Sequence, residues 1–208
     1  MGVLGASGHG KVVAETALAA GWESVIFYDD AWPHKSAIGR WAIVGDGDAL
    51  LAALGDLDGV IVAIGRNEIR LSLLDRLRSA GASVSTIIHP AAVVSGSVSL
   101  GAGSVVMPGA IVNADARIGD GSILNTGCSI DHDCVLGNAV HVSPGARLAG
   151  GVSVGDRSWI GIGAVVRQGQ CIGQDVVVGA GAAVVSDLPD GVVAVGVPAR
   201  PLSTCRSK

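Results

Sequence analysis

Aromatic residues are scarce in this sequence: its 208 residues include four Trp, one Tyr and one Phe. This excludes a core filled by aromatic rings and requires one built from Val, Ile, Leu and Ala. Five of the six aromatics lie within the first 41 residues, and only Trp159 comes later. The uneven distribution predicts two differently built units in one chain.

Charged residues are also few, at 15%, and the formal net charge is −4. This balance excludes a general electrostatic attraction to nucleic acid or to an anionic membrane surface. No apolar run approaches the roughly 18 to 20 residues that span a bilayer, and the segment Met1–Gly5 does not contain the basic residues of a secretory signal. We therefore expect a cytoplasmic protein with no membrane or nucleic-acid partner.

Cysteine pairs with metal-binding or redox spacing are absent. The four cysteines, at 128, 134, 171 and 205, form no C-x-x-C pair, so we expect small reduced thiols rather than disulfides. The 32 glycines follow no three-residue period, which excludes collagen.

The chain does contain a repeat with a period of six. From Ile88 to Val184 every sixth residue is Val, Ile or Leu, at 17 consecutive positions. The fourth residue after each is usually small, and Gly often follows directly, where it supplies positive φ or close backbone approach. This period fits neither a helix nor a hairpin. It predicts a repeated flat strand and corner, with three units closing an 18-residue triangular coil and the aliphatic residue filling each corner from inside.

This pattern resembles the hexapeptide-repeat acyltransferases. The resemblance implies a left-handed parallel β-helix over residues 87–208, a homotrimer, and an acyl-CoA groove between neighbouring helices. On the coil alone, a metal-dependent hydratase of the carbonic-anhydrase-like type and a non-catalytic scaffold remain alternatives.

Residues 1–86 alternate predicted strands with predicted helices, which is typical of an α/β, Rossmann-like unit with a small parallel sheet. The expected strands are 2–5, 24–28, 60–64 and 84–88; the expected helices are 11–20, 48–54 and 68–80, the last with Asn67 as its N-cap.

A glycine-rich turn, residues 5–10, joins the first strand to the first helix. The amides of such a turn bind anions, and the acidic pair Asp29–Asp30 follows the second strand, where carboxylates bind ribose hydroxyls. The spacing is G-x-x-G-x-G and not the dinucleotide fingerprint G-x-G-x-x-G. It favours a phosphate-bearing ligand other than NAD, with a purely structural turn as the alternative.

Four segments narrow the resemblance to bacterial sugar-nucleotide N-acetyltransferases that act on UDP-4-amino-4,6-dideoxy sugars, as in the bacillosamine pathway. Sialic-acid O-acetyltransferases and GDP-perosamine N-acetyltransferases are close relatives. The segments are GASGHGK at 5–11, FYDD at 27–30, AIGRNEIR at 63–70 and DHDC at 131–134. The resemblance implies a nucleotide-sugar site formed by Ser7, Gly8, His9, Asp29, Asp30 and Gly65. Arg66 departs from the family, which often has Asn there.

Acetyl transfer to an amine needs a base for the amine's proton, and histidine suits this role. His132 lies between Asp131 and Asp133 in a segment otherwise made of small and aliphatic residues. A carboxylate on one ring nitrogen raises its basicity, but adjacent residues of a strand point to opposite sides, so the contact requires a bend. We predict that His132 is the base. The resemblance makes the same assignment, with Asp133 assisting; a solvated polar corner is the alternative.

His141 follows His132 by nine residues, which is half of an 18-residue coil. The two imidazoles therefore share a site only across a subunit interface. The resemblance implies that acetyl-CoA is bound by Asn125, His141, Gly150, Ile162 and Ala180. Arg167, Arg200 and Lys208 are candidates for its phosphates, with solvated surface charge as the alternative, which we favour for Lys208. A third convergent metal ligand is not evident, so no metal is expected.

Together these features predict an acetyl-CoA-dependent N-acetyltransferase that acts on the amino group of a nucleotide-linked sugar. The alternative is an O-acetyltransferase of sialic acid or of another surface sugar.

Overall fold

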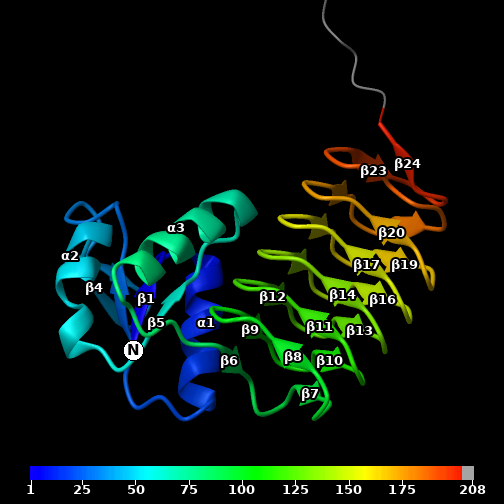
Figure 1. Cartoon of the computed structure of the whole chain (residues 1–208). Helices are drawn as coiled ribbons and strands as arrows, with labels where there is room; N and C mark the ends of the chain where they lie inside the picture. The colour runs from blue at the N-terminus through cyan, green and yellow to red at the C-terminus, as the bar shows by residue number, and fades with distance from the viewer. Residues whose placement is uncertain (203–208) are drawn as a thin grey trace, which may run out of the picture.

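A computed structural model describes residues 1–202 of the chain. It places a small α/β unit beside a tall parallel coil (Figure 1). The elements of the α/β unit are β1 (Gly2–Leu4), α1 (Gly8–Ala19), β2 (Ile26–Tyr28), β3 (Ala37–Ile38), β4 (Trp41–Gly45), α2 (Gly47–Ala52), the 3-10 helix η1 (Leu54–Asp56), β5 (Val60–Val62) and α3 (Asn67–Ser79).

The sheet of the α/β unit has the strand order β3-β4-β2-β1-β5, and only the β3–β4 pair is antiparallel. β3 and β4 are not among the strands that the sequence predicts. Between them Gly39 has a φ of 58°, which permits a tight reversal. β3 has only two residues, and β4 contains apolar residues and Gly alone, so neither strand shows a period-two pattern in its sequence.

Two helix starts differ from the prediction. α1 begins at Gly8, earlier than expected, because the Ser7 hydroxyl accepts a hydrogen bond from the Gly10 amide at 3.4 Å and caps the helix. Asn67 was expected to cap α3 but is its first residue, and Arg66 takes the cap position without a side-chain bond. The Asn67 amide instead donates to the coil, to the carbonyl of Arg157 at 2.8 Å.

The coil begins at Ile87, and from β6 to β22 it is built from two-residue strands in three parallel sheets. One sheet holds β6 (Ile87–Ile88), β9 (Val105–Val106), β12 (Ile123–Leu124), β15 (His141–Val142), β18 (Trp159–Ile160), β21 (Val177–Val178), β23 (Val193–Val195) and the antiparallel β24 (Arg200–Pro201). The second holds β7 (Val93–Val94), β10 (Ile111–Val112), β13 (Ser129–Ile130), β16 (Arg147–Leu148), β19 (Val165–Val166) and β22 (Ala183–Val184). The third holds β8 (Ser99–Leu100), β11 (Arg117–Ile118), β14 (Val135–Leu136), β17 (Ser153–Val154) and β20 (Cys171–Ile172).

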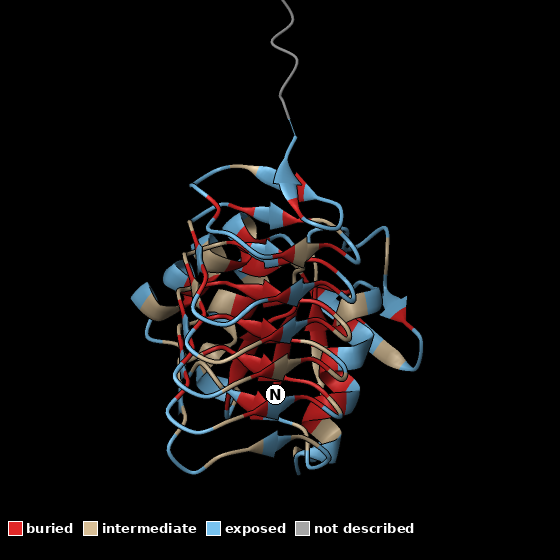
Figure 2. Ribbon diagram, turned by 90° about the vertical axis from the view of Figure 1, so that its right-hand side faces the viewer, coloured by how far each residue is buried: buried red, intermediate tan, exposed pale blue. Residues whose placement is uncertain are grey.

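The repeating aliphatic residue is the second residue of each strand and not a corner residue, which corrects the prediction. Successive side chains of a strand point to opposite faces, so this residue fills the bore while its neighbour faces outward, as with exposed Ile111 before buried Val112. The small residues of the repeat, such as Ala110 and Cys128, are fully buried in the same core. Figure 2 shows the buried residues concentrated in the stacked strands. At the open first coil, Ile88 remains 40% exposed.

The turns between strands use a backbone conformation that L-residues rarely adopt. Every sixth residue from 103 to 181 has a φ between 52° and 76°, and nine of these fourteen residues are glycine. The exceptions are Asp115, Asp133, Ala139, Arg157 and Asp175. The glycines that directly follow the aliphatic residue serve a different purpose: a Cβ on Gly137 would lie 2.8 Å from the Asp156 amide nitrogen, so they permit close approach of stacked coils.

The α/β unit and the coil share one core. α1 packs on the outward residues of the first three strands of the β6–β23 sheet, so that Ile87, Val105 and Ile123 are buried with Val13 and Phe27. The same sheet continues beyond these strands to β15, β18 and β21, where only His9, at the start of α1, approaches His141 of β15. Within residues 1–202, no helix combines the length and apolar character needed to span a membrane.

Candidate active site

His132 and Asp133 form a pair in the turn between β13 and β14. The Nδ1 of His132 lies 2.7 Å from Oδ2 of Asp133, and both side chains are 66% exposed. Asp133 has a φ of 59°, and this left-handed residue supplies the bend that lets two adjacent side chains face each other. Asp tolerates this conformation better than most residues. The expected contact between His132 and a neighbouring carboxylate is therefore present.

The Asp133 carboxylate changes the chemistry of the imidazole. Its hydrogen bond raises the pKa of His132 above the ordinary value, with smaller contributions from the negative charges of Asp133 and Asp131. When Nδ1–H donates to Asp133, the lone pair of Nε2 is free to accept a proton. The ring lies over Gly150 of the next coil, because a Cβ there would be only 2.6 Å from Cε1 and Nε2.

His141 is buried on the outward face of β15. Its ring stacks on Trp159 with centroids 4.7 Å apart, and its Nε2 lies 3.1 Å from Nδ2 of Asn125. The Asn125 amide donates, so Nε2 accepts and the proton is on Nδ1, which has no hydrogen-bond partner among the described residues. Burial, followed by the charge of Arg70, lowers the pKa of His141 to about 3, and the imidazole is neutral near pH 7.

An apolar groove of about 460 Å³ runs along the uncovered part of this sheet and the turns that follow its strands. Three of the residues predicted to bind acetyl-CoA line it together: His141, Ile162 and Ala180. Asn125 joins them through its contact with His141. Gly150 does not line the groove; it lies beneath His132. Trp159 forms part of the groove wall, and its Nε1–H donates to Ser143 Oγ at 2.6 Å.

Within one chain the predicted base thus lies apart from most of the residues predicted to bind acetyl-CoA. His132 and Gly150 lie in turns between the second and third sheets, and neither lines the groove on the first sheet.

A cavity of about 320 Å³ lies at the carboxyl ends of β1 and β2, the edge where parallel sheets bind ligands. Its lining includes Gly5, Asp29, Asp30 and Ile64. Asp29 already accepts two backbone hydrogen bonds, from the Ala6 amide at 2.6 Å and the Ala31 amide at 2.9 Å, and it holds the glycine-rich turn in place. Asp30 is exposed, and its Oδ1 accepts from the Gly47 amide at 3.3 Å.

The other residues predicted for the nucleotide sugar lie around this cavity without lining it. Ser7 caps α1, Gly8 is the exposed first residue of that helix, and the Gly65 carbonyl accepts from Arg70. His9 does not line the groove but lies near its wall, with its ring centroid 6.4 Å from that of His141. Burial, then the charge of Arg70, lowers the pKa of His9 to about 4. The glycine-rich turn therefore adjoins the apolar groove of the same chain.

The remaining cationic candidates are at the surface. Arg66 is exposed and borders a cavity of about 280 Å³ together with Arg157 and Trp159. Arg167 and Arg200 are exposed, and Lys208 lies outside the described residues. Among residues 1–202, no three His, Cys, Asp or Glu side chains converge as metal ligands.

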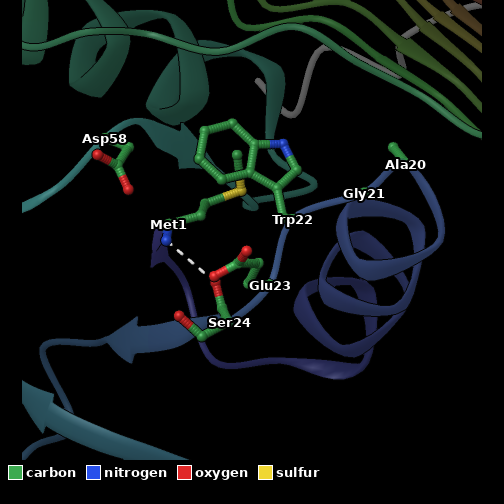
Figure 3. A pocket seen from close by; sticks show the side chains of 7 residues that line it. All are labelled: Met1, Ala20, Gly21, Trp22, Glu23, Ser24 and Asp58. Carbon is green, nitrogen blue, oxygen red and sulfur yellow. Dashed lines mark hydrogen bonds between the residues drawn. The ribbon is translucent and has the colours of Figure 1, made fainter.

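A further pocket of about 330 Å³ lies at the opposite, amino-terminal ends of β1 and β2 (Figure 3). Trp22, Glu23 and Asp58 line it, and the Met1 ammonium donates to the Ser24 carbonyl at 3.0 Å. Ligands of parallel sheets bind at the carboxyl ends of the strands, so this pocket is not the nucleotide-sugar candidate.

Arg70 is a buried residue of the site region that the sequence analysis missed. It is 1% exposed and bonds to carbonyls on both sides of the junction between the α/β unit and the coil. An Arg on an amphipathic helix is normally solvated, so nothing marked it as buried.

The fold and the site together define an acyltransferase of the left-handed β-helix class. The parallel coil carries the apolar groove and the exposed His–Asp pair, and the α/β unit beside it carries the glycine-rich turn. Comparison with known proteins gives the family. Residues 1–77 match the PglD N-terminal domain family. No curated protein matches the chain.

Three solved structures are similar over nearly the whole chain. The acetyltransferase domain of PglB from Neisseria gonorrhoeae, in complex with acetyl coenzyme A, is 42% identical with a TM-score of 0.93, covering 97% of this chain and 98% of that one. PerB from Caulobacter crescentus, in complex with CoA and GDP-perosamine, is 47% identical with a TM-score of 0.92, covering 97% and 96%. WeeI from Acinetobacter baumannii is 30% identical with a TM-score of 0.86, covering 97% and 98%. The chain belongs to the hexapeptide-repeat sugar-nucleotide N-acetyltransferases of the bacillosamine and perosamine type.

Proposed function

We propose that this chain transfers the acetyl group of acetyl-CoA to the amino group of a nucleotide-linked sugar, with His132 as the general base. The observation that carries the base assignment is the His132–Asp133 pair, whose 2.7 Å contact leaves Nε2 free and raises the pKa of the imidazole. The family membership supports the reaction class and both co-substrates.

The amine attacks the thioester carbonyl directly, and a carbon–nitrogen bond forms as the carbonyl becomes a tetrahedral oxyanion. Nε2 of His132 accepts the proton that the nitrogen loses, and Asp133 stabilises the resulting imidazolium. Backbone amides of the turns stabilise the oxyanion. The carbon–sulfur bond then breaks, and the imidazolium returns the proton to the departing CoA thiolate. The products are the N-acetyl sugar and CoA.

The groove on β15, β18 and β21 is proposed to hold the pantetheine arm and the acetyl group. Its wall is mostly apolar, which suits the thioester end of CoA. The neutral imidazole of His141 lies in this wall and does not compete with His132 for the proton, because its pKa is near 3.

The nucleotide sugar is proposed to bind at the cavity beside the glycine-rich turn. The amides at the start of α1 are oriented to bind its phosphates, and the exposed carboxylate of Asp30, which uses Oδ1 to accept from Gly47, is placed to meet the ribose through Oδ2. His9 then lies between this ligand and the groove, since its ring is 6.4 Å from that of His141. A UDP-linked 4-amino-4,6-dideoxy sugar is the expected substrate type.

We propose that a cytoplasmic homotrimer completes the site, with His132 of one subunit reaching the groove of the next. The half-coil offset between the two histidines supports this arrangement. Large apolar side chains flank both halves of the site and are exposed in the single chain: Val135 is 46%, Ile162 58% and Val165 45% exposed. A neighbouring copy would cover them.

The function is tested by incubating the purified protein with acetyl-CoA and a panel of UDP- and GDP-linked amino sugars, followed by mass spectrometry. One amino sugar is expected to gain a single acetyl group, while its 4-hydroxy counterpart and free sialic acid do not. Acetylation of the hydroxy sugars alone would contradict N-acetylation.

Mixed oligomers test the shared site. His132→Ala removes the base, and Ile162→Arg blocks the groove that holds the acetyl group. Each variant alone is therefore expected to be inactive. Randomly mixed trimers regain about a quarter of the wild-type rate, because each site draws its two halves from different subunits. No recovery in mixed trimers would place both halves within one chain.

A further inference from the structure

Arg70 of α3 is a buried cation whose five N–H groups are all bonded, although no carboxylate is among its partners. The side chain is 1% exposed. Nε donates to the carbonyl of Gly121 at 2.6 Å, Nη1 to the carbonyls of Ile64 at 2.9 Å and Gly65 at 3.2 Å, and Nη2 to Oδ1 of Asn67 and the carbonyl of Ala139, both at 2.8 Å.

Some of these acceptors lie at the cavity proposed for the nucleotide sugar, and others lie near the groove proposed for acetyl-CoA. Ile64 follows β5 and lines the cavity proposed for the nucleotide sugar. Gly121 and Ala139 occupy the same turn position in consecutive coils, and Ala139 is two residues before His141 in the groove wall. A single guanidinium therefore joins the wall of the sugar cavity to the backbone that carries the groove.

Asn67 extends this connection to a third coil. Its Nδ2 donates to the carbonyls of Arg157 at 2.8 Å and Ser158 at 3.1 Å. The turn residues Gly121, Ala139 and Arg157 are spaced by 18 and all have positive φ, so the first turn of α3 bonds to a ridge of stacked left-handed turns.

Only arginine satisfies this set of acceptors. Its planar fork carries five donors in fixed directions, whereas the lysine ammonium has three on a single atom. With lysine at position 70, at least two of the five buried oxygens lose their donor. The stack of turns would then be free to shift relative to β5.

We propose that Arg70 is a positioning residue for acetyl transfer: it fixes the location and orientation of the sugar cavity relative to the acetyl groove. It touches neither proposed substrate. This inference rests on the proposed function. A displacement near 1 Å between two reacting groups lowers a rate by roughly 100-fold, so small shifts at this junction have large effects on turnover.

The test uses Arg70→Lys, with Arg78→Met as the matched control. Arg78 lies on the same helix and also reaches the coil, but through a partly exposed ion pair with Asp120 at 2.8 Å. Turnover is measured with the nucleotide sugar identified for the wild type, and the binding of acetyl-CoA and of the free nucleoside diphosphate is measured by calorimetry. We expect kcat of Arg70→Lys to fall roughly 100-fold, with both dissociation constants within about threefold and full binding stoichiometry. Arg78→Met keeps wild-type turnover.

Several outcomes overturn the inference. A wild-type kcat in Arg70→Lys would show that position 70 does not set the placement of the sugar cavity relative to the acetyl groove. If turnover and the stoichiometry of ligand binding fall together, the role of Arg70 is purely structural. Should Arg70→Lys not fold, Asn67→Ala removes the third-coil bonds and is expected to lower kcat roughly 10-fold with unchanged ligand binding; an unchanged kcat contradicts the proposal. Absence of wild-type turnover would instead refute the proposed function itself.

Discussion

Substitution of Gly150 by Ala tests whether catalysis depends on the position of the His132 ring. A Cβ on Gly150 would lie 2.6 Å from both Cε1 and Nε2 of His132, and ordinary contact begins at 3.4 Å. The ring must therefore retreat by about 1 Å, a misplacement that lowers a rate by roughly 100-fold. Because the imidazole is 66% exposed, it moves into solvent without disturbing the coil.

The assay combines initial rates with thermal unfolding. We expect kcat of Gly150→Ala to fall roughly 100-fold, with KM for acetyl-CoA unchanged and a melting temperature within a few degrees of wild type. The control is Gly96→Ala, where a new Cβ meets nothing within 4 Å and full activity is expected. Wild-type turnover in Gly150→Ala would refute the reasoning, as would a rise in KM with unchanged kcat.

Two further predictions follow from the pKa shifts. Because Asp133 raises the pKa of His132, Asp133→Asn lowers that pKa and moves the acidic limb of the kcat/KM profile to lower pH, with a reduced plateau; an unmoved limb would separate Asp133 from the base. The pKa values of His9 and His141 are lowered to about 4 and about 3, so the unfolded chain binds more protons below pH 6.5 and stability is lost as pH falls. At pH 5 the loss is about 2 kcal/mol per histidine, measurable by urea unfolding at fixed protein concentration. His141→Asn should recover about half of it, and equal stability at pH 7 and pH 5 would contradict the burial of both rings.

The coil was predictable because its six-residue period of Val, Ile and Leu can be read directly from the sequence. An aliphatic residue at every sixth position leaves one geometry that buries all of them, and the sheets confirm it from β6 to β22. The hairpin of β3 and β4 was missed because β3 has only two residues and β4, WAIVG, contains no polar side chain, so its sequence shows no alternation of apolar and polar residues.

The His132–Asp133 contact was predicted with its requirement for a bend, but the source of the bend was not visible. It is the positive φ of Asp133, at a turn position more often occupied by glycine. His141, Ile162 and Ala180 lie in one groove because their spacings of 21 and 18 residues, close to or equal to one 18-residue coil, place them on successive coils.

Arg70 could not be found because its partners are set by tertiary structure. Two of its acceptors, the carbonyls of Gly121 and Ala139, are 51 and 69 residues away along the chain. The role of Asp29 was hidden for the same reason: its carboxylate accepts the Ala6 amide, 23 residues away, and closes the glycine-rich turn.

The most direct test of the central claim is the turnover of His132→Gln, measured with acetyl-CoA and the nucleotide-linked amino sugar. Glutamine keeps a polar side chain in the turn but cannot accept the amine's proton at neutral pH. We predict that kcat falls by roughly 100-fold or more, while the oligomer and acetyl-CoA binding are unchanged. Turnover of His132→Gln near the wild-type rate would contradict the assignment of the base and the mechanism built on it.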